Sequence, residues 1–172
     1  MPPSERLVAG LNEQVGREFA AAHQYVAIGA YYEAQTFPQL AQFFYEQAEE
    51  ERKHAMKMVN YLLESGGRIE LSEVPAPRGT FEDHVEPIQV ALEQERANTV
   101  GIGKLFEAAR ETRDHASEVF LQWFVEEQVE EEAEMESLLQ VAERVREFPM
   151  MVEEFIARDG GTLGGARGPA SG

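Results

Sequence analysis

Apolar residues recur every three or four positions along almost the whole chain, the spacing that places them on one face of an α-helix. This periodicity predicts four long helices and a short fifth one, over about 5–35, 38–64, 81–112, from 114 or 117 to 147, and 150–159. Ser4 is a favourable N-cap for the first helix, and Pro38 suits the first turn of the second. Gly66 and Gly67 favour the end of the second helix.

The lengths of the connections predict how these helices are arranged. A few residues join the first helix to the second and the third to the fourth, so each pair packs antiparallel. A linker with Pro75 and Pro77 separates the second helix from the third. Extended, about 14 residues reach about 46 Å, the length of a helix of about 30 residues. We therefore expect an all-α four-helix bundle with one long crossover and a short fifth helix.

Each long helix carries polar side chains in the middle of its apolar stripe, and the first of them lies about 12–14 residues from the start of the helix. They are Glu18, Glu51, His54, Glu95, Gln128 and Glu131. Helices that run up and down bring them to one level, where no lysine or arginine lies on a stripe. One such residue alone is more simply explained by a side chain that reaches solvent. Four aligned interruptions favour a buried metal site, and oxygen ligands with one imidazole suit iron or manganese.

Composition narrows the classes of function. The formal net charge is −17, which argues against nucleic acid as a partner because phosphate binding needs a basic face. No apolar run approaches the roughly 20 residues of a membrane span, so we expect no membrane partner. The chain has no cysteine, and its first residues lack the pattern of a secretory signal. These features fit a cytoplasmic protein.

The chain resembles the prokaryotic non-haem ferritins over residues from about 5 to 158, and we take residues 1–158 as one domain. The segments that carry the resemblance are LNEQVGREF, FPQLAQFF, EEERKHA, EQER and FLQWFVEEQVEEE. The resemblance implies a ferritin-like bundle with a di-iron centre. One iron would be held by Glu18, Glu51 and His54, and the second by Glu51, Glu95 and Glu131.

Further roles follow from the resemblance. Gln128 would hydrogen-bond to a ligand or to bound oxygen, and Tyr25 and Trp123 would lie beside the centre, although core packing explains both aromatics equally well. Ferritin-like bundles usually carry a second Glu-x-x-His on the fourth helix, where this chain has Glu130 and Glu131. That departure is typical of ferritins and not of bacterioferritins or rubrerythrins.

Two more expectations concern the same region. In prokaryotic ferritins, residues matching Glu50, Glu127 and Glu130, with Glu131 shared, form a third iron site; the alternative is a solvated acidic edge. The haem-ligating methionine of bacterioferritins corresponds here to Arg52, which carries only donors, so we expect no haem.

The function that the resemblance implies is iron storage with ferroxidase activity. Fe²⁺ would be oxidised by O₂ or H₂O₂ and stored as a ferric mineral in a hollow homo-oligomeric shell of 24 copies, with the fifth helix at a symmetry axis. A DNA-protecting mini-ferritin, a di-iron oxidase and a metal-free scaffold are the competing functions. The Gly-rich tail, residues 159–172, is expected to be flexible: a docking peptide for an encapsulin shell or an inert end. The remaining histidines, His23, His84 and His115, are expected at the surface.

Overall fold

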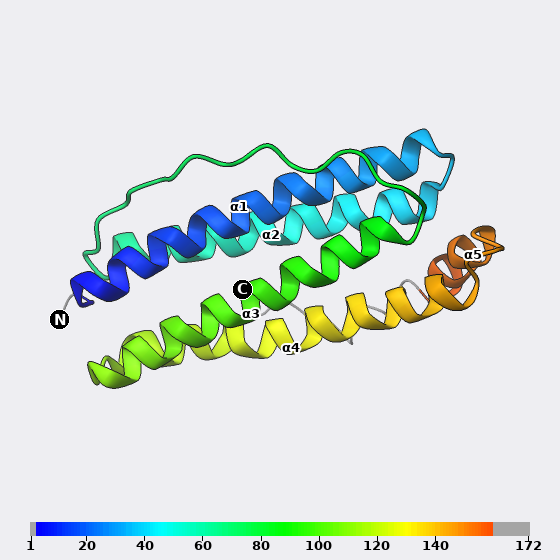
Figure 1. The fold of residues 1–172 in the computed structure, drawn as a ribbon. Helices are drawn as coiled ribbons and strands as arrows, with labels where there is room; N and C mark the ends of the chain where they lie inside the picture. The colour runs from blue at the N-terminus through cyan, green and yellow to red at the C-terminus, as the bar shows by residue number, and fades with distance from the viewer. Residues whose placement is uncertain (1–2, 160–172) are drawn as a thin grey trace.

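The computed structural model describes residues 3–159, and within that range it is all-helical (Figure 1). The helices are α1 (Glu5–Ala34), α2 (Pro38–Glu64), α3 (Glu86–Glu111), α4 (His115–Arg144) and α5 (Met150–Asp159). Helices α1 and α2 lie side by side, α3 and α4 form the second pair, and the connection from α2 to α3 runs along the outside of the first pair. The predicted four-helix bundle with one long crossover and a short fifth helix is confirmed.

Side chains and proline fix where the helices begin. The Ser4 hydroxyl accepts a hydrogen bond from the Leu7 amide at 3.3 Å. The Asp114 carboxylate accepts one from the Ser117 amide at 3.1 Å, so Asp114 is the N-cap of α4 and Ser117 lies inside the helix. Helix α4 ends at Arg144, about three residues earlier than the sequence predicts.

Helices α1, α2 and α3 all end in the same way. In each, an amide just beyond the helix bonds to the carbonyl five residues earlier, a pattern that requires a residue with positive φ between them. These residues are Thr36 (64°), Gly66 (79°) and Arg113 (55°). Only Gly66 adopts this backbone conformation without steric cost, which is why the sequence marks the end of α2 most clearly.

Helix α3 begins later than its hydrophobic pattern predicts, at Glu86 instead of Phe81. The Asp83 carboxylate accepts hydrogen bonds from the Val85 and Glu86 amides at 2.9 and 3.0 Å, which holds the chain in a turn. Pro87 then occupies the first helical turn, where its missing N–H costs nothing.

Two buried amides of α1 hold the crossover against the bundle. Asn12 donates to the Arg68 carbonyl and accepts from the Glu70 amide, both at 2.7 Å. Gln24 donates to the carbonyl of Arg78 at 2.8 Å and accepts from its amide at 2.9 Å. Each side chain thus satisfies two backbone groups of a segment without regular structure of its own. The crossover is tied down at two points along the bundle.

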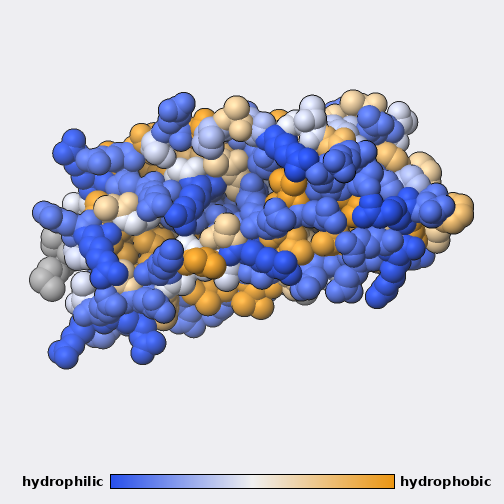
Figure 2. Space-filling model, viewed as in Figure 1, coloured by the Kyte–Doolittle hydropathy of each residue, from blue (hydrophilic) through white to orange (hydrophobic). Residues whose placement is uncertain are grey.

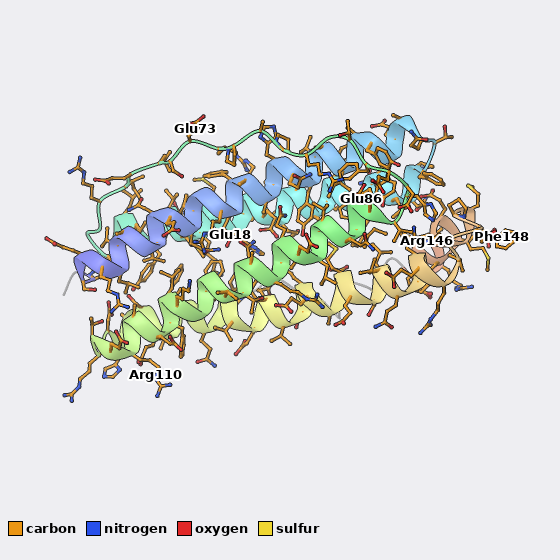
Figure 3. The ribbon with its side chains drawn as sticks, viewed as in Figure 1. Glu18, Glu73, Glu86, Arg110, Arg146 and Phe148 are labelled. Carbon is orange, nitrogen blue, oxygen red and sulfur yellow. The ribbon has the colours of Figure 1, made fainter. Side chains whose placement is uncertain are left out.

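The apolar core is split into two clusters with a polar layer between them. One cluster contains Tyr25, Phe44 and Leu138 and extends to α5. The other contains Leu11 and Phe124 and lies toward the opposite end of the bundle. The division falls at mid-length, where Figure 3 places Glu18 between the helices.

Helix α5 packs on its own bundle through one face. Its Glu153 is buried and accepts hydrogen bonds from the Gln39 and Leu40 amides at the start of α2, both at 2.8 Å. The carboxylate thereby satisfies two N–H groups at a helix terminus and meets the positive end of the helix dipole. Val152 and Ile156 join the core.

Some apolar side chains at the α5 end of the bundle remain exposed. Phe148, Met150 and Met151 are at least half exposed, and Phe148 projects from the end of the bundle in Figure 3. The rest of the visible face is mostly hydrophilic, with separated apolar patches (Figure 2). No helix within residues 3–159 is both long and apolar enough to cross a membrane.

Candidate metal centre

Five ionisable side chains from all four long helices converge in the layer between the two apolar clusters. Glu18, Glu51 and Glu95 are 0% exposed, His54 is 3% exposed and Glu131 is 7% exposed. Two sets of three ligand atoms lie within 4.8 Å of one another: those of Glu18, Glu51 and His54, and those of Glu51, Glu95 and Glu131. Glu51 belongs to both sets, so it can bridge two cations.

The imidazole of His54 faces the carboxylates with one nitrogen. Its Nδ1 lies 3.6 Å from Glu131, 3.7 Å from Glu51 and 3.8 Å from Glu18. Its Nε2 points toward Glu127, at 3.9 Å. These distances are longer than hydrogen bonds, and they leave room for an ion between Nδ1 and the carboxylates.

The electrostatics of the layer favour protons or cations. Burial raises the pKa of Glu51 well above its ordinary value, and the charges of Glu95, Glu18 and Glu131 raise it further. Burial and the neighbouring carboxylates likewise raise the pKa of Glu131. The pKa of Glu95 rises to about 7, chiefly through burial, although hydrogen bonds from Tyr25 and Gln128 lower it. A divalent cation would neutralise charge that the protein itself leaves uncompensated.

Glu95 is held by donors from two other helices. The Tyr25 hydroxyl donates to Glu95 Oε1, and Gln128 Nε2 lies 3.3 Å from Oε2 and 3.1 Å from the Glu95 carbonyl. Gln128 Nε2 also lies 3.2 Å from Thr99 Oγ1, which donates in turn to Glu132. Tyr25 and Gln128 therefore both act on the same carboxylate of the layer.

Sequence reasoning missed the donor that holds Glu18. Gln14 Nε2 donates to Glu18 Oε1 at 2.8 Å, and Gln14 is almost completely buried. The two residues are four apart on α1, a spacing that places them on the same face of the helix. That spacing is the signal that was available in the sequence.

Comparison with known proteins agrees with this geometry. The family model described as a ferritin-like domain matches residues 8–145. The chain belongs to the ferritin family. It is 43% identical to ferritin BfrB of Mycobacterium tuberculosis over 157 residues, covering 91% of this chain and 87% of the relative. It is 39% identical to the bacterial non-heme ferritin of Staphylococcus aureus over 142 residues, covering 83% and 86%.

Solved structures give the same family. An open-pore ferritin from the archaeon Archaeoglobus fulgidus superposes with a TM-score of 0.85 at 30% identity, covering 90% of this chain and 97% of that one. Ferritins are iron-storage proteins. The resemblance to prokaryotic non-haem ferritins stated from the sequence motifs is therefore confirmed.

The residues expected at a third iron site of this ferritin lie beside the centre in different environments. Glu127 is half-buried, and one of its oxygens can join His54 and Glu131 around a cation. Glu50 is half-buried and forms an ion pair with Lys53 at 2.9 Å. Glu130 is exposed. Of these three residues, only Glu127 joins a compact ligand group in the described part of the chain.

Aromatic rings cover the His54 side of the ferritin centre. Trp123 lies edge-on to His54 at 5.4 Å between ring centroids, and Lys57 Nζ lies 3.7 Å from the centre of an indole ring of Trp123. Phe124 packs on the same imidazole at 5.9 Å. Trp123 thus lies beside His54 and also takes part in packing.

One prediction about the remaining histidines is wrong. His23 and His115 are exposed, as expected, but His84 is only partly exposed and its Nε2 is buried. Burial lowers the pKa of His84. Its position at the end of the crossover, where Tyr32 donates to its carbonyl at 2.6 Å, explains the error, because helical stripes do not apply there.

Proposed function

We propose that this ferritin oxidises Fe²⁺ with O₂ at a di-iron centre and stores the Fe³⁺ as a ferric mineral inside a hollow shell. The observation that carries the proposal is the buried layer of four carboxylates and one imidazole. Among the described residues, these carboxylates form ion pairs only with His54. An uncompensated buried cluster of this kind costs several kcal/mol unless cations or protons occupy it.

The ligand set also determines which chemistry is favoured. Glu18 and His54 would hold one iron, Glu95 and Glu131 the other, and Glu51 would bridge the two. Hard anionic oxygen ligands stabilise Fe³⁺ relative to Fe²⁺, so each bound Fe²⁺ more readily gives an electron to O₂ or H₂O₂. Iron is a substrate of this reaction and not a resident cofactor, because the Fe³⁺ that forms leaves the centre and is added to the mineral.

The surrounding side chains would position these ligands. Tyr25 and Gln128 hold Glu95, and Gln128 would also hydrogen-bond to oxygen species near the second iron. Glu50, Glu127 and Glu130, with Glu131 shared, would form a third site through which Fe³⁺ leaves. The exposed carboxylate of Glu130 and the half-buried one of Glu127 supply the outer part of that route.

We further propose that the chain assembles as a homo-oligomeric shell of 24 copies. The apolar residues left open beside α5 support this proposal, since Phe148, Met150 and Met151 would be covered by neighbouring copies. Haem is not expected in the shell, because Arg52 replaces the thioether ligand. Mass photometry tests the assembly: a 12-subunit particle or a dimer would contradict it.

Iron loading tests the function directly. The protein is given repeated additions of Fe²⁺ in air, and iron per chain is measured after gel filtration. We expect far more iron than a di-iron centre holds, which indicates storage. Two ions per chain would instead indicate a di-iron oxidase, and no bound iron would indicate a scaffold.

A role as cargo of an encapsulin shell remains a separate proposal. It depends on the Gly-rich tail, and residues 160–172 lie outside the described residues. Co-expression with a candidate shell protein, with and without residues 159–172, tests it. Equal loading of both forms would rule out the tail as a docking peptide.

A further inference from the structure

Gln14 is a buried amide whose position is defined by the residues around it. It is 1% exposed, and its Nε2 lies 2.8 Å from Glu18 Oε1 and 3.4 Å from Asn98 Oδ1. Asn98 lies on α3 and is 3% exposed. The amide therefore joins a carboxylate of the centre to the neighbouring helix.

This hydrogen bond makes the two oxygens of Glu18 different. Oε1 accepts from Gln14, whereas Oε2 is buried and accepts no hydrogen bond from any described residue. Oε2 also lies 3.8 Å from His54 Nδ1. A carboxylate held in this way presents one oxygen to the centre and keeps the other occupied.

We propose that Gln14 is a positioning residue that fixes Glu18 as a ligand through Oε2. The inference rests on the proposed function, because it concerns the first of the two iron positions. Residues that orient a metal ligand typically contribute about 10–100-fold in metal affinity or activity. Gln14 has this relation to Glu18, because its amide is the only N–H group among the described residues that donates a hydrogen bond to that carboxylate.

The packing around Gln14 leaves space for the amide. A Cβ atom on Gly101 of α3 would lie 2.4 Å from Gln14 Oε1 and 2.6 Å from Arg17 Nη1. Glycine at this point of the α1–α3 contact therefore lets the amide take its position beside Glu18. An alanine there would force the ends of both side chains to move.

Binding of Co²⁺ tests the inference with a readout other than iron oxidation. Gln14→Met keeps an unbranched side chain of similar length and removes the donor. We expect one of two Co²⁺ ions to bind about 10–100-fold more weakly, with altered visible absorption bands, while the other ion keeps its wild-type affinity. The Fe²⁺ concentration at half-maximal oxidation rate should rise more than the maximal rate falls.

Gln24→Met is the matched control. Gln24 is also a buried glutamine of α1, but it bonds to the crossover and not to the centre. We expect this variant to lose thermal stability and to keep wild-type Co²⁺ affinity and spectrum. Equal weakening of Co²⁺ binding in both variants would show a general packing effect and overturn the inference.

Gly101→Ala provides an independent test if Gln14→Met does not fold. Alanine favours the helix over glycine, so a weaker Co²⁺ site in a chain at least as stable cannot result from unfolding. We expect Gly101→Ala to bind one Co²⁺ ion more weakly than the wild-type chain does. If Gly101→Ala or folded Gln14→Met instead keeps the wild-type Co²⁺ affinity and spectrum, the inference about Gln14 is overturned, while the proposed di-iron function is not. Failure of the wild-type chain to bind two Co²⁺ ions would overturn the proposed di-iron function together with it.

Discussion

The carboxylates of the centre differ according to the helices that carry them. Glu18 on α1 and Glu95 on α3 each accept hydrogen bonds from buried side chains. Glu51 on α2 accepts none from any N–H or hydroxyl of the described residues, and Glu131 Oε2 on α4 is likewise without a donor. The first pair is held by hydrogen bonds from other side chains, whereas Glu51 and Oε2 of Glu131 have no such donor to hold them.

Because of this difference, the four carboxylates suit different ligand positions around the two ions. A carboxylate held by donors offers an oxygen at a defined place, so Glu18 and Glu95 suit terminal positions. Glu51 and Glu131 can turn without breaking a hydrogen bond, which suits a bridge and a ligand shared with an outgoing ion. Burial and the neighbouring carboxylates raise the pKa of both groups, so each binds a proton more readily than an exposed glutamate does.

The largest effect on Fe²⁺ oxidation is expected from removal of Glu51, the carboxylate that would bridge the two iron ions. Glu51→Ala should lower the initial rate of Fe²⁺ oxidation in stopped flow by more than about 100-fold, since loss of a ligand exceeds loss of an orienting partner. The helical circular dichroism should persist, because the change relieves repulsion. Glu49→Ala, an exposed carboxylate on the same helix, serves as the control. A wild-type rate in Glu51→Ala would disprove the centre.

Removal of one donor from a fixed carboxylate should have a smaller effect. Tyr25→Phe takes away one of the two side chains that hold Glu95, and Gln128 remains. We expect the oxidation rate to fall by about tenfold, the lower end of the range for orienting partners. Tyr32→Phe removes a buried hydroxyl of the same helix that bonds to the crossover, and it should lower stability only. Equal rates in the two variants would count against a role for Tyr25.

The stability of the metal-free protein should depend on pH in an unusual direction. Glu51, Glu95 and Glu131 bind protons more tightly when folded, so their contribution is fully present below the ordinary carboxyl pKa. It is lost as pH rises, for Glu95 between 4.5 and about 7. We expect Tm to fall on the order of 5 °C between pH 5 and pH 8, as measured by calorimetry.

Two comparisons sharpen that measurement. Glu51→Gln should flatten the dependence of Tm on pH, because it removes one of the shifted groups, whereas Glu49→Gln should not. Saturating Co²⁺ should restore stability at the higher pH, because the cation replaces the protons. A Tm that rises with pH in the metal-free protein would show that other groups dominate.

The smallest effect on the first round of Fe²⁺ oxidation is expected from a substitution outside the buried layer of carboxylates. Glu130→Ala should leave the first round of Fe²⁺ oxidation nearly unchanged, because Glu130 is exposed and belongs to neither set of central ligands. A role in iron exit predicts a slower second round and a changed ratio of Fe²⁺ oxidised per O₂, measured with an oxygen electrode. If both stay at wild-type values, Glu130 belongs to an ordinary acidic surface.

Residues that lie on helical stripes could be placed from the sequence alone. Periodicity aligned Glu18, Glu51 and Glu95 at one level because helix length converts directly into height along the bundle. The capping residue Ser4 and the turn at Gly66 marked helix ends for equally local reasons. What is local in sequence, or repeats with the helical period, was predictable.

The remaining features depend on contacts that the pattern does not encode. The space beside Gly101 exists only because α3 packs against α1, so the spacing of Gln14 and Glu18 in the sequence did not by itself show that the amide fits beside the centre. The late start of α3 depends on the Asp83 turn, and the partial burial of His84 depends on the crossover. The space beside Gly101 and the burial of His84 reflect how segments distant in sequence meet, whereas the Asp83 turn is local and interrupts an apolar pattern that continues through it.

The crossover held by Asn12 and Gln24 has a consequence for the order of folding. Helices α1 and α2 form one hairpin and α3 and α4 another, each made of contacts close in sequence, which form fastest. Docking the hairpins requires closing the long loop, so we expect it to come later. The first hairpin carries Glu18, Glu51 and His54, and the second carries Glu95 and Glu131. A cation that contacts both hairpins therefore binds only the docked chain and favours the last step of its folding.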